Sequence, residues 1–269
     1  MNQKESDVLE QYILMLSSLF HSETQIKPII NVQVEFVDDL YSRRLELAYN
    51  EKEKQSILDA KAFLINCNGT MVLPEHINNN PYILISKKLI NSEGAFFHTF
   101  CHELTHVYDF YDFAKVNNVE LFQLIESHKY FGALYHWSEF HARRNGYFLY
   151  RKAIDLLLDD KILDKEHLNH IINVEYPTQL DYLIKQLWEH VDSPTQFIYN
   201  IMQFLGRYSV WEDMFPEHFN SAKLPQTLIN GFGKKINELY SFLQSNIKFD
   251  DVKYQFDKLE VIIKKFVTE

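Results

Sequence analysis

Residues 96–111 read FFHTFCHELTHVYDFY and carry the strongest structural signal in the chain. Aromatic and aliphatic side chains recur there at the three- and four-residue spacing of a helix, with Leu104 in the middle of the apolar face. His102 and His106 lie only about 40° apart on a helical wheel, and Glu103 lies about 60° from His106 on the same side. The segment therefore predicts a helix that separates an apolar face from a face of His and Glu.

The pattern His102-Glu103-Leu104-Thr105-His106 is an HExxH motif, which predicts a metal site. Two imidazoles one helical turn apart can reach the same ion, and the carboxylate beside them can contact a water molecule bound to it. A catalytic zinc site has three protein ligands and keeps a fourth position for water. The two histidines therefore leave one ligand to be supplied, and we expect it on a later helix.

A later helical segment, YHWSEFHARR, offers Glu139, His136 and His141 as candidates for the third ligand. Glu139 is favoured because it shares a helical face with Gly132 and Gly146, and small residues let two helices approach closely. His136 is the second choice. His141 points about 200° away from Glu139, so these two side chains cannot bind the same ion.

Three further side chains are candidates for positions near the site, although His98 could equally be a structural neighbour and Arg143 a surface residue. Asp109 lies within about 20° of His102 on the wheel and could accept a hydrogen bond from an imidazole N–H. His98 is on the same row of the helix. Arg143 follows Glu139 by one turn and could orient its carboxylate or hold a substrate carbonyl.

The letters of the motif, HELTH at residues 102–106, resemble those of zincins, and in particular of thermolysin-like enzymes. The downstream Glu139-x-x-Ala142 resembles the third-ligand helix of gluzincins, especially the minigluzincin type and the ImmA/IrrE-like peptidases. The likeness covers roughly residues 30–155. It implies one Zn²⁺ per chain, with His102, His106 and Glu139 as ligands and Glu103 as the general base.

The expected fold is α+β and mostly helical, with a small N-terminal β-sheet packed on the motif helix and the glutamate helix. Hydrophobic alternation and turn signals predict about four short strands before residue 90, at residues 32–36, 62–67, 70–73 and 82–85. Asn68-Gly69 is a strong signal for a β-hairpin between the second and third of them. After residue 91 the periodicity is helical. We expect a catalytic core over residues 1–155 and a helical C-terminal region over residues 156–269, packed on that core and possibly forming a single domain with it.

The composition indicates which classes of partner and which cellular compartment to expect. The chain carries 27 basic and 37 acidic residues and a net charge of -10, which disfavours nucleic acid as a partner. The N-terminal residues lack a signal-peptide pattern, and the best apolar run there, Tyr12 to Phe20, is too short to span a membrane. Cys67 and Cys101 cannot make a disulfide framework, which favours a reducing compartment. We therefore expect a cytoplasmic protein, and no pattern in the sequence specifies its oligomeric state.

The function predicted from these residues is a zinc metallopeptidase, a hydrolase acting on peptide or protein substrates. Zinc would activate a water molecule, and Glu103 would take its proton and pass it to the leaving amine. One alternative is a catalytically silent zincin-fold binding or regulatory protein. Another is a helical interaction module whose HExxH pattern is accidental. Metal content separates the last from the other two, and turnover of a peptide library separates those two from each other.

Overall fold

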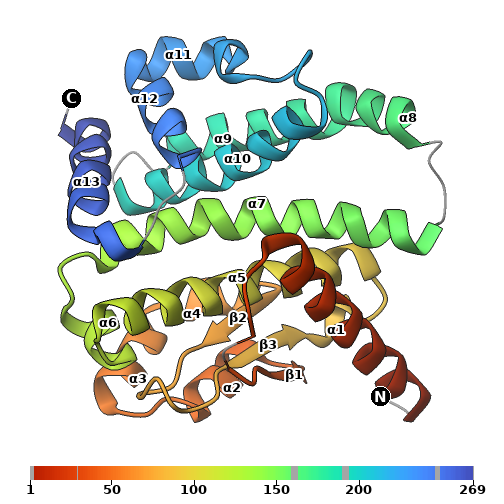
Figure 1. Cartoon of the computed structure of the whole chain (residues 1–269), viewed down its shortest axis with the longest axis vertical. Coiled ribbons are helices and arrows are strands. Elements are labelled where there is room, and N and C mark those ends of the chain that lie inside the picture. The colour runs from red at the N-terminus through yellow and green to blue at the C-terminus, as the bar shows by residue number, and fades with distance from the viewer. Residues whose placement is uncertain (1–2, 29, 159–162, 190–193, 246–248, 269) are drawn as a thin grey trace. The chain divides into compact units, whose positions relative to one another are not determined.

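The computed structural model describes residues 3–28, 30–158, 163–189, 194–245 and 249–268 (Figure 1). In these residues the chain is mostly helical and holds one three-stranded sheet, which confirms the predicted α+β, mostly helical class. The chain divides into two compact units. The first unit is Met1–Ser127 with Asn145–Leu157, and the second is His128–Arg144 with Leu158–Glu269.

The first unit holds the sheet and the motif helix. Its elements, labelled in Figure 1, are α1 (Gln3–Thr24), β1 (Gln33–Val37), α2 (Leu40–Glu46), α3 (Glu51–Asp59), α4 (Lys61–Asn66), β2 (Gly69–Val72), β3 (Tyr82–Ser86), a 3₁₀ turn (Lys87–Leu89), α5 (Glu93–Asn117), α6 (Leu121–Ser127) and the second half of α7 (Phe131–Leu158).

The sheet has the strand order β1-β3-β2. Strand β3 is central and pairs parallel with β1 and antiparallel with β2, so that Ile83 lies opposite both Val34 and Met71. Ile83, Leu84 and Ile85 are fully buried, as expected for a central strand whose two faces are both covered. Strand β2 therefore lies at an edge of the sheet.

The predicted hairpin at Asn68-Gly69 is wrong, and the described residues before residue 90 form three strands rather than four. Residues 62–67 belong mostly to helix α4, in which Leu64 is the buried side chain. A type I′ turn needs positive φ at both central residues, and neither Asn68 nor Gly69 has it. Strand β2 pairs antiparallel with β3 instead.

Helix α5 packs against β2 and β3 and is the longest element of the first unit. Gly69 permits this contact, because a Cβ at that position would lie 2.6 Å from Cγ2 of Thr99 on α5. Phe96 on α5 contacts Phe36 of β1, with the ring centroids 5.6 Å apart. The helix ends at Asn118, which adopts the left-handed conformation (φ 51°, ψ 49°) that commonly closes a helix. The predicted motif helix is therefore confirmed, and it lies on the sheet.

All the regular secondary structure of the second unit is helical in its described residues. Its elements are the first half of α7, α8 (Leu163–His170), a π-helical turn (Ile171–Glu175), α9 (Tyr176–Glu189), α10 (Pro194–Met214), a 3₁₀ turn (Ser221–Lys223), α11 (Gln226–Phe232), α12 (Lys234–Leu243), a second 3₁₀ turn (Phe249–Asp251) and α13 (Val252–Thr268).

Helix α10 lies very close to the first half of α7. A Cβ at Gly206 would lie 2.5 Å from the carbonyl oxygen of Phe140 and 2.9 Å from Cβ of Arg143, so only glycine fits there. Helix α10 also packs along α9. Among the described helices of the whole chain, none is both long and apolar enough to cross a membrane.

Candidate metal centre

His102 and His106 lie one turn apart on α5 with their rings turned toward each other. Their Nε2 atoms are 3.1 Å apart, and the two ring planes are nearly perpendicular, at 89°. Both side chains are buried, with exposed fractions of 8% and 4%. The position of the two imidazoles one turn apart on the same face is the arrangement expected from the helical spacing of the motif.

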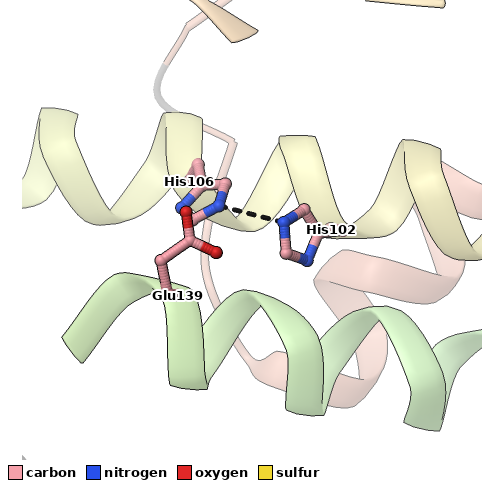
Figure 2. A group of neighbouring side chains, drawn as sticks. All are labelled: His102, His106 and Glu139. Carbon is pink, nitrogen blue, oxygen red and sulfur yellow. Dashed lines mark hydrogen bonds between the residues drawn. The ribbon is translucent and has the colours of Figure 1, made fainter. Parts of the chain in front are cut away.

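Glu139 on α7 completes a group of three possible metal ligands. One atom each from His102, His106 and Glu139 lies within 4.8 Å of the other two, and all three residues are buried. Figure 2 shows the two imidazoles extending from α5 and the carboxylate of Glu139 extending toward them from α7. These are the three residues that the sequence predicts as ligands, and together they could bind a metal ion.

The donor atoms fit zinc in type and spacing. Two imidazole nitrogens and one carboxylate oxygen form a donor set used by catalytic zinc sites. Two nitrogens that each lie ~2.1 Å from a tetrahedral zinc ion are about 3.4 Å from each other, close to the 3.1 Å between the two imidazoles. Three protein ligands also leave the fourth position of a tetrahedral site open.

The carboxylate of Glu139 is held by neighbours from its own unit. Gln203 on α10 donates a hydrogen bond from Nε2 to Glu139, and Tyr135, one turn earlier on α7, also hydrogen-bonds to it. Arg143 donates a hydrogen bond from Nε to Oε1 of Gln203, and its charge favours the ionised form of Glu139. Burial has the larger effect, and raises the pKa of Glu139 to about 7. Arg143, which the sequence suggested could orient this carboxylate, is therefore connected to it by hydrogen bonds through Gln203.

Glu103 lies beside the ligand group and is not part of it. Its side chain is 9% exposed, and its Oε2 accepts a hydrogen bond of 2.8 Å from the backbone N–H of Met71 on β2. The edge strand therefore fixes the carboxylate that the sequence assigns as the general base.

Comparisons with protein-family models, with curated proteins and with solved structures found no match for this chain. The likeness to zincins therefore rests on the motif residues and on their arrangement.

The other candidate residues take different positions. His136 and His141 are outside the ligand group. Burial lowers the pKa of His136 to about 4, so that its ring is neutral at pH 7, and His141 stacks on Trp137 with the ring centroids 4.9 Å apart. His98 stacks on His102, at 6.0 Å between centroids, and Asp109 is buried.

Sequence reasoning missed the contacts made by Gln203 and Met71. Gln203 lies 64 residues after Glu139, and nothing in its own neighbourhood resembles a metal motif. The nearest signal was Gly206, one turn later on α10, since a small residue at that place permits the close approach to α7. The hydrogen bond from Met71 depends on the position of β2 beside β3. The sequence wrongly paired residues 70–73 with residues 62–67, so it did not predict this position.

Proposed function

We propose that this chain is a zinc-dependent metallopeptidase of the gluzincin-like zincin type, related to the minigluzincin and ImmA/IrrE-like peptidases, that hydrolyses peptide bonds in a peptide or protein substrate. The observation that carries the proposal is the buried group of His102, His106 and Glu139, with Glu103 adjacent to it. Two imidazoles, one ligating carboxylate and a second, non-ligating carboxylate are the parts that a catalytic zinc site requires.

Each side chain has a distinct role in this proposal. His102, His106 and Glu139 would hold the ion, and Tyr135 and Gln203 would orient the carboxylate of Glu139. Zinc, when bound, supplies a Lewis acid that polarises a carbonyl group and lowers the pKa of water. Glu103 accepts a proton from the attacking water molecule and delivers it to the nitrogen of the leaving amine.

Strand β2 supports a peptide as the substrate. The carbonyl oxygen of Asn68 accepts a hydrogen bond from the N–H of Ser86. Backbone groups of a strand point to alternate sides, so those of Thr70 and Val72 also point toward β3. The backbone groups of Gly69 and Met71 face the opposite way, and the N–H of Met71 reaches Glu103. The N–H of Met71 is thus already used by Glu103. An extended peptide that pairs with this edge through Gly69 would lie beside the proposed base.

A catalytically silent zincin-fold binding or regulatory protein is the second candidate. The observation that favours it is burial, because His102, Glu103, His106 and Glu139 are each at most 9% exposed. A site this enclosed can retain a metal ion as a structural or signalling element without admitting a polypeptide.

Metal analysis and peptide turnover test the proposal. The purified protein should contain close to one equivalent of zinc, and His102→Ala or His106→Ala should remove it. The zinc-loaded protein should cleave members of an unbiased peptide library. Unchanged zinc content in both variants would refute the metal site, and firmly bound zinc without any cleavage would favour the binding protein.

The variant Glu103→Gln tests the proposed chemistry. It keeps the size of the side chain and removes the proton acceptor, so zinc content should stay near the wild-type value. Hydrolysis should fall by roughly 10²–10⁴-fold, the usual contribution of general acid–base catalysis. Equal cleavage by the parent and this variant would show that Glu103 is not the base.

A cytoplasmic location is also part of the proposal. Both cysteines, Cys67 and Cys101, are free thiols, which is compatible with a reducing compartment. The excess of acidic residues disfavours nucleic acid as a partner.

A further inference from the structure

The second unit contains a small polar pocket that shares Arg143 and Gln203 with the surroundings of Glu139. The proposed peptidase chemistry assigns no role to the rest of its lining. The pocket has a volume of about 150 Å³ and is lined by side chains of α7, α9 and α10. The residues that line it include two arginines, Arg143 and Arg207, and three residues with side-chain amides, Gln179, Asn200 and Gln203. Two arginines lining one small pocket are notable in a chain with a net charge of -10.

Asn200 gives the clearest sign that the pocket is built for a ligand. The residue is 5% exposed, and its Oδ1 accepts a hydrogen bond of 3.1 Å from Nε2 of Gln196. Its buried Nδ2 has no hydrogen-bond partner among the residues that the structure describes. A buried donor without an acceptor is unfavourable, so an acceptor atom bound in the pocket would remove that cost.

The charge of the lining defines what kind of acceptor fits. Arginine stays protonated at every physiological pH, and its planar fork of N–H donors matches the two oxygens of a carboxylate. The remaining lining is partly apolar, since Leu183 and Phe204 are 1% and 5% exposed and also line the pocket. A carboxylate carried on a short carbon chain satisfies both kinds of lining at once.

The size and the opening of the pocket agree with such a ligand. Pockets for drug-sized molecules usually enclose about 300–1,000 Å³, so a pocket of about 150 Å³ suits a single functional group or side chain. Tyr182 lines the pocket and is 56% exposed, which places solvent at its rim.

We propose that this pocket binds a short organic carboxylate, of which the side chain of an acidic peptide residue is one example. The carboxylate accepts hydrogen bonds from Nδ2 of Asn200 and from the guanidinium groups, and its carbon chain lies against Leu183 and Phe204. The site belongs to the second unit alone, and its occupation needs neither a metal ion nor catalysis.

Calorimetric titration of the full chain with glutarate tests this proposal. Glutarate should bind with one-to-one stoichiometry and more tightly than inorganic phosphate. Asn200→Asp preserves size and places a negative charge against the ligand, so it should weaken glutarate binding at least tenfold, and Asn200→Leu should weaken it as well. Far-UV circular dichroism checks that each variant is folded, and two substitutions at one position guard against the failure of either.

Two control variants make the result specific. Arg144→Gln changes the neighbouring arginine, which bonds to Asp213 and does not line the pocket, and it should leave glutarate affinity unchanged. His102→Ala should also bind glutarate normally, which distinguishes the pocket from coordination of glutarate by zinc. Absence of saturable binding, tighter binding of phosphate, loss of binding in His102→Ala or unchanged affinity in both Asn200 variants would each overturn the proposal.

Discussion

Glu139 combines deep burial with polar neighbours that hold its carboxylate. Its side chain is 5% exposed, and burial raises its pKa more than Arg143, Tyr135 and Gln203 lower it. A carboxyl group with a pKa of about 7 is partly protonated at neutral pH when no ion is bound. Binding of a metal ion by this residue is therefore coupled to the release of a proton.

The stability of the metal-free protein should accordingly depend on pH through Glu139. In the unfolded chain this group titrates near its ordinary value of 4.5, and in the folded chain near 7. Between these values the unfolded state binds fewer protons, so the free energy of unfolding falls as pH rises, by up to about 3 kcal/mol. Chemical denaturation in the presence of a chelator should show this decline between pH 4.5 and 7. Glu139→Gln should remove that component, and the same pH dependence in both proteins would contradict the assignment.

Gln203 should contribute to metal affinity although it is not a ligand. Its amide connects Arg143 to Glu139, so Gln203→Leu leaves the carboxylate without one of its donors. Residues that orient a ligand typically change metal affinity by about 10–100-fold, and we expect a loss in this range in a zinc competition assay. Gln226→Leu is the matched control, because Gln226 is exposed and bonds only locally to Asn230. Equal zinc affinity of Gln203→Leu and the control would show that Gln203 has no such role.

The sequence predicted those site residues whose positions follow from local helical spacing. His102, Glu103 and His106 share a face because of the helical repeat, and Glu139 was favoured by the small residues near it. Gln203 and Met71 reach the site only through long-range packing, which no local pattern records.

Close contacts of helix α5 with strand β2 and with the backbone of helix α7 occur at two glycines of the first unit. Gly69 lets β2 lie against α5, and Gly146 lets the second half of α7 lie against the same helix. A Cβ at Gly146 would lie 2.9 Å from the carbonyl oxygen of His98 and 3.1 Å from Cβ of His102. The expected close approach is thus confirmed at Gly146, whereas Gly132 has no atom within 4 Å of its Cβ position.

Replacing Gly146 and Gly132 by alanine should distinguish the effect of close packing on stability from the effect of helix propensity. Gly146→Ala pushes α7 against the backbone of α5 and should destabilise the protein by about 1–3 kcal/mol, as other overpacked contacts do. It should also weaken zinc binding, since the new methyl group presses on His102. Gly132→Ala is the control and should be neutral or slightly stabilising, because Ala favours a helix over Gly. Denaturant unfolding measures both, and similar free energies for the two variants would contradict the close packing at Gly146.

The sheet shows where element-scale prediction failed. Asn68-Gly69 has the residues of a hairpin turn, yet Gly69 is required for its lack of a side chain beside Thr99 rather than for a turn. Residues 61–66 form a helix in which Phe63 and Ile65 are about half exposed, so the apolar run did not indicate a buried strand. Both errors came from reading a local signal that tertiary packing overrides.

At the scale of the whole molecule, helix α7 links the two units. Residues 131–144 of this helix belong to the second unit and residues 145–157 to the first. The half that carries Glu139 lies very close to α10 at Gly206. The sequence placed the division between a core and a C-terminal region at residues 155 and 156, and that division stays a prediction.

A chain truncated after Leu158 tests whether residues 1–155 are sufficient. Without α10, the half of α7 that carries Glu139 loses the contacts that hold it, and an isolated helical segment of that length is marginal in water. We expect the fragment to bind zinc at least tenfold more weakly than the full chain and to unfold without a sharp transition. A cooperatively folded fragment with one equivalent of zinc would instead establish an independent catalytic core.

The most direct test of the metal centre is an anomalous diffraction measurement at the zinc absorption edge, on crystals of the zinc-loaded full chain. We predict one anomalous peak within about 2.0–2.2 Å of a nitrogen of His102, a nitrogen of His106 and a carboxylate oxygen of Glu139. A peak bound by His136 or His141 in place of Glu139, or no peak near the two motif histidines, would contradict the proposed site.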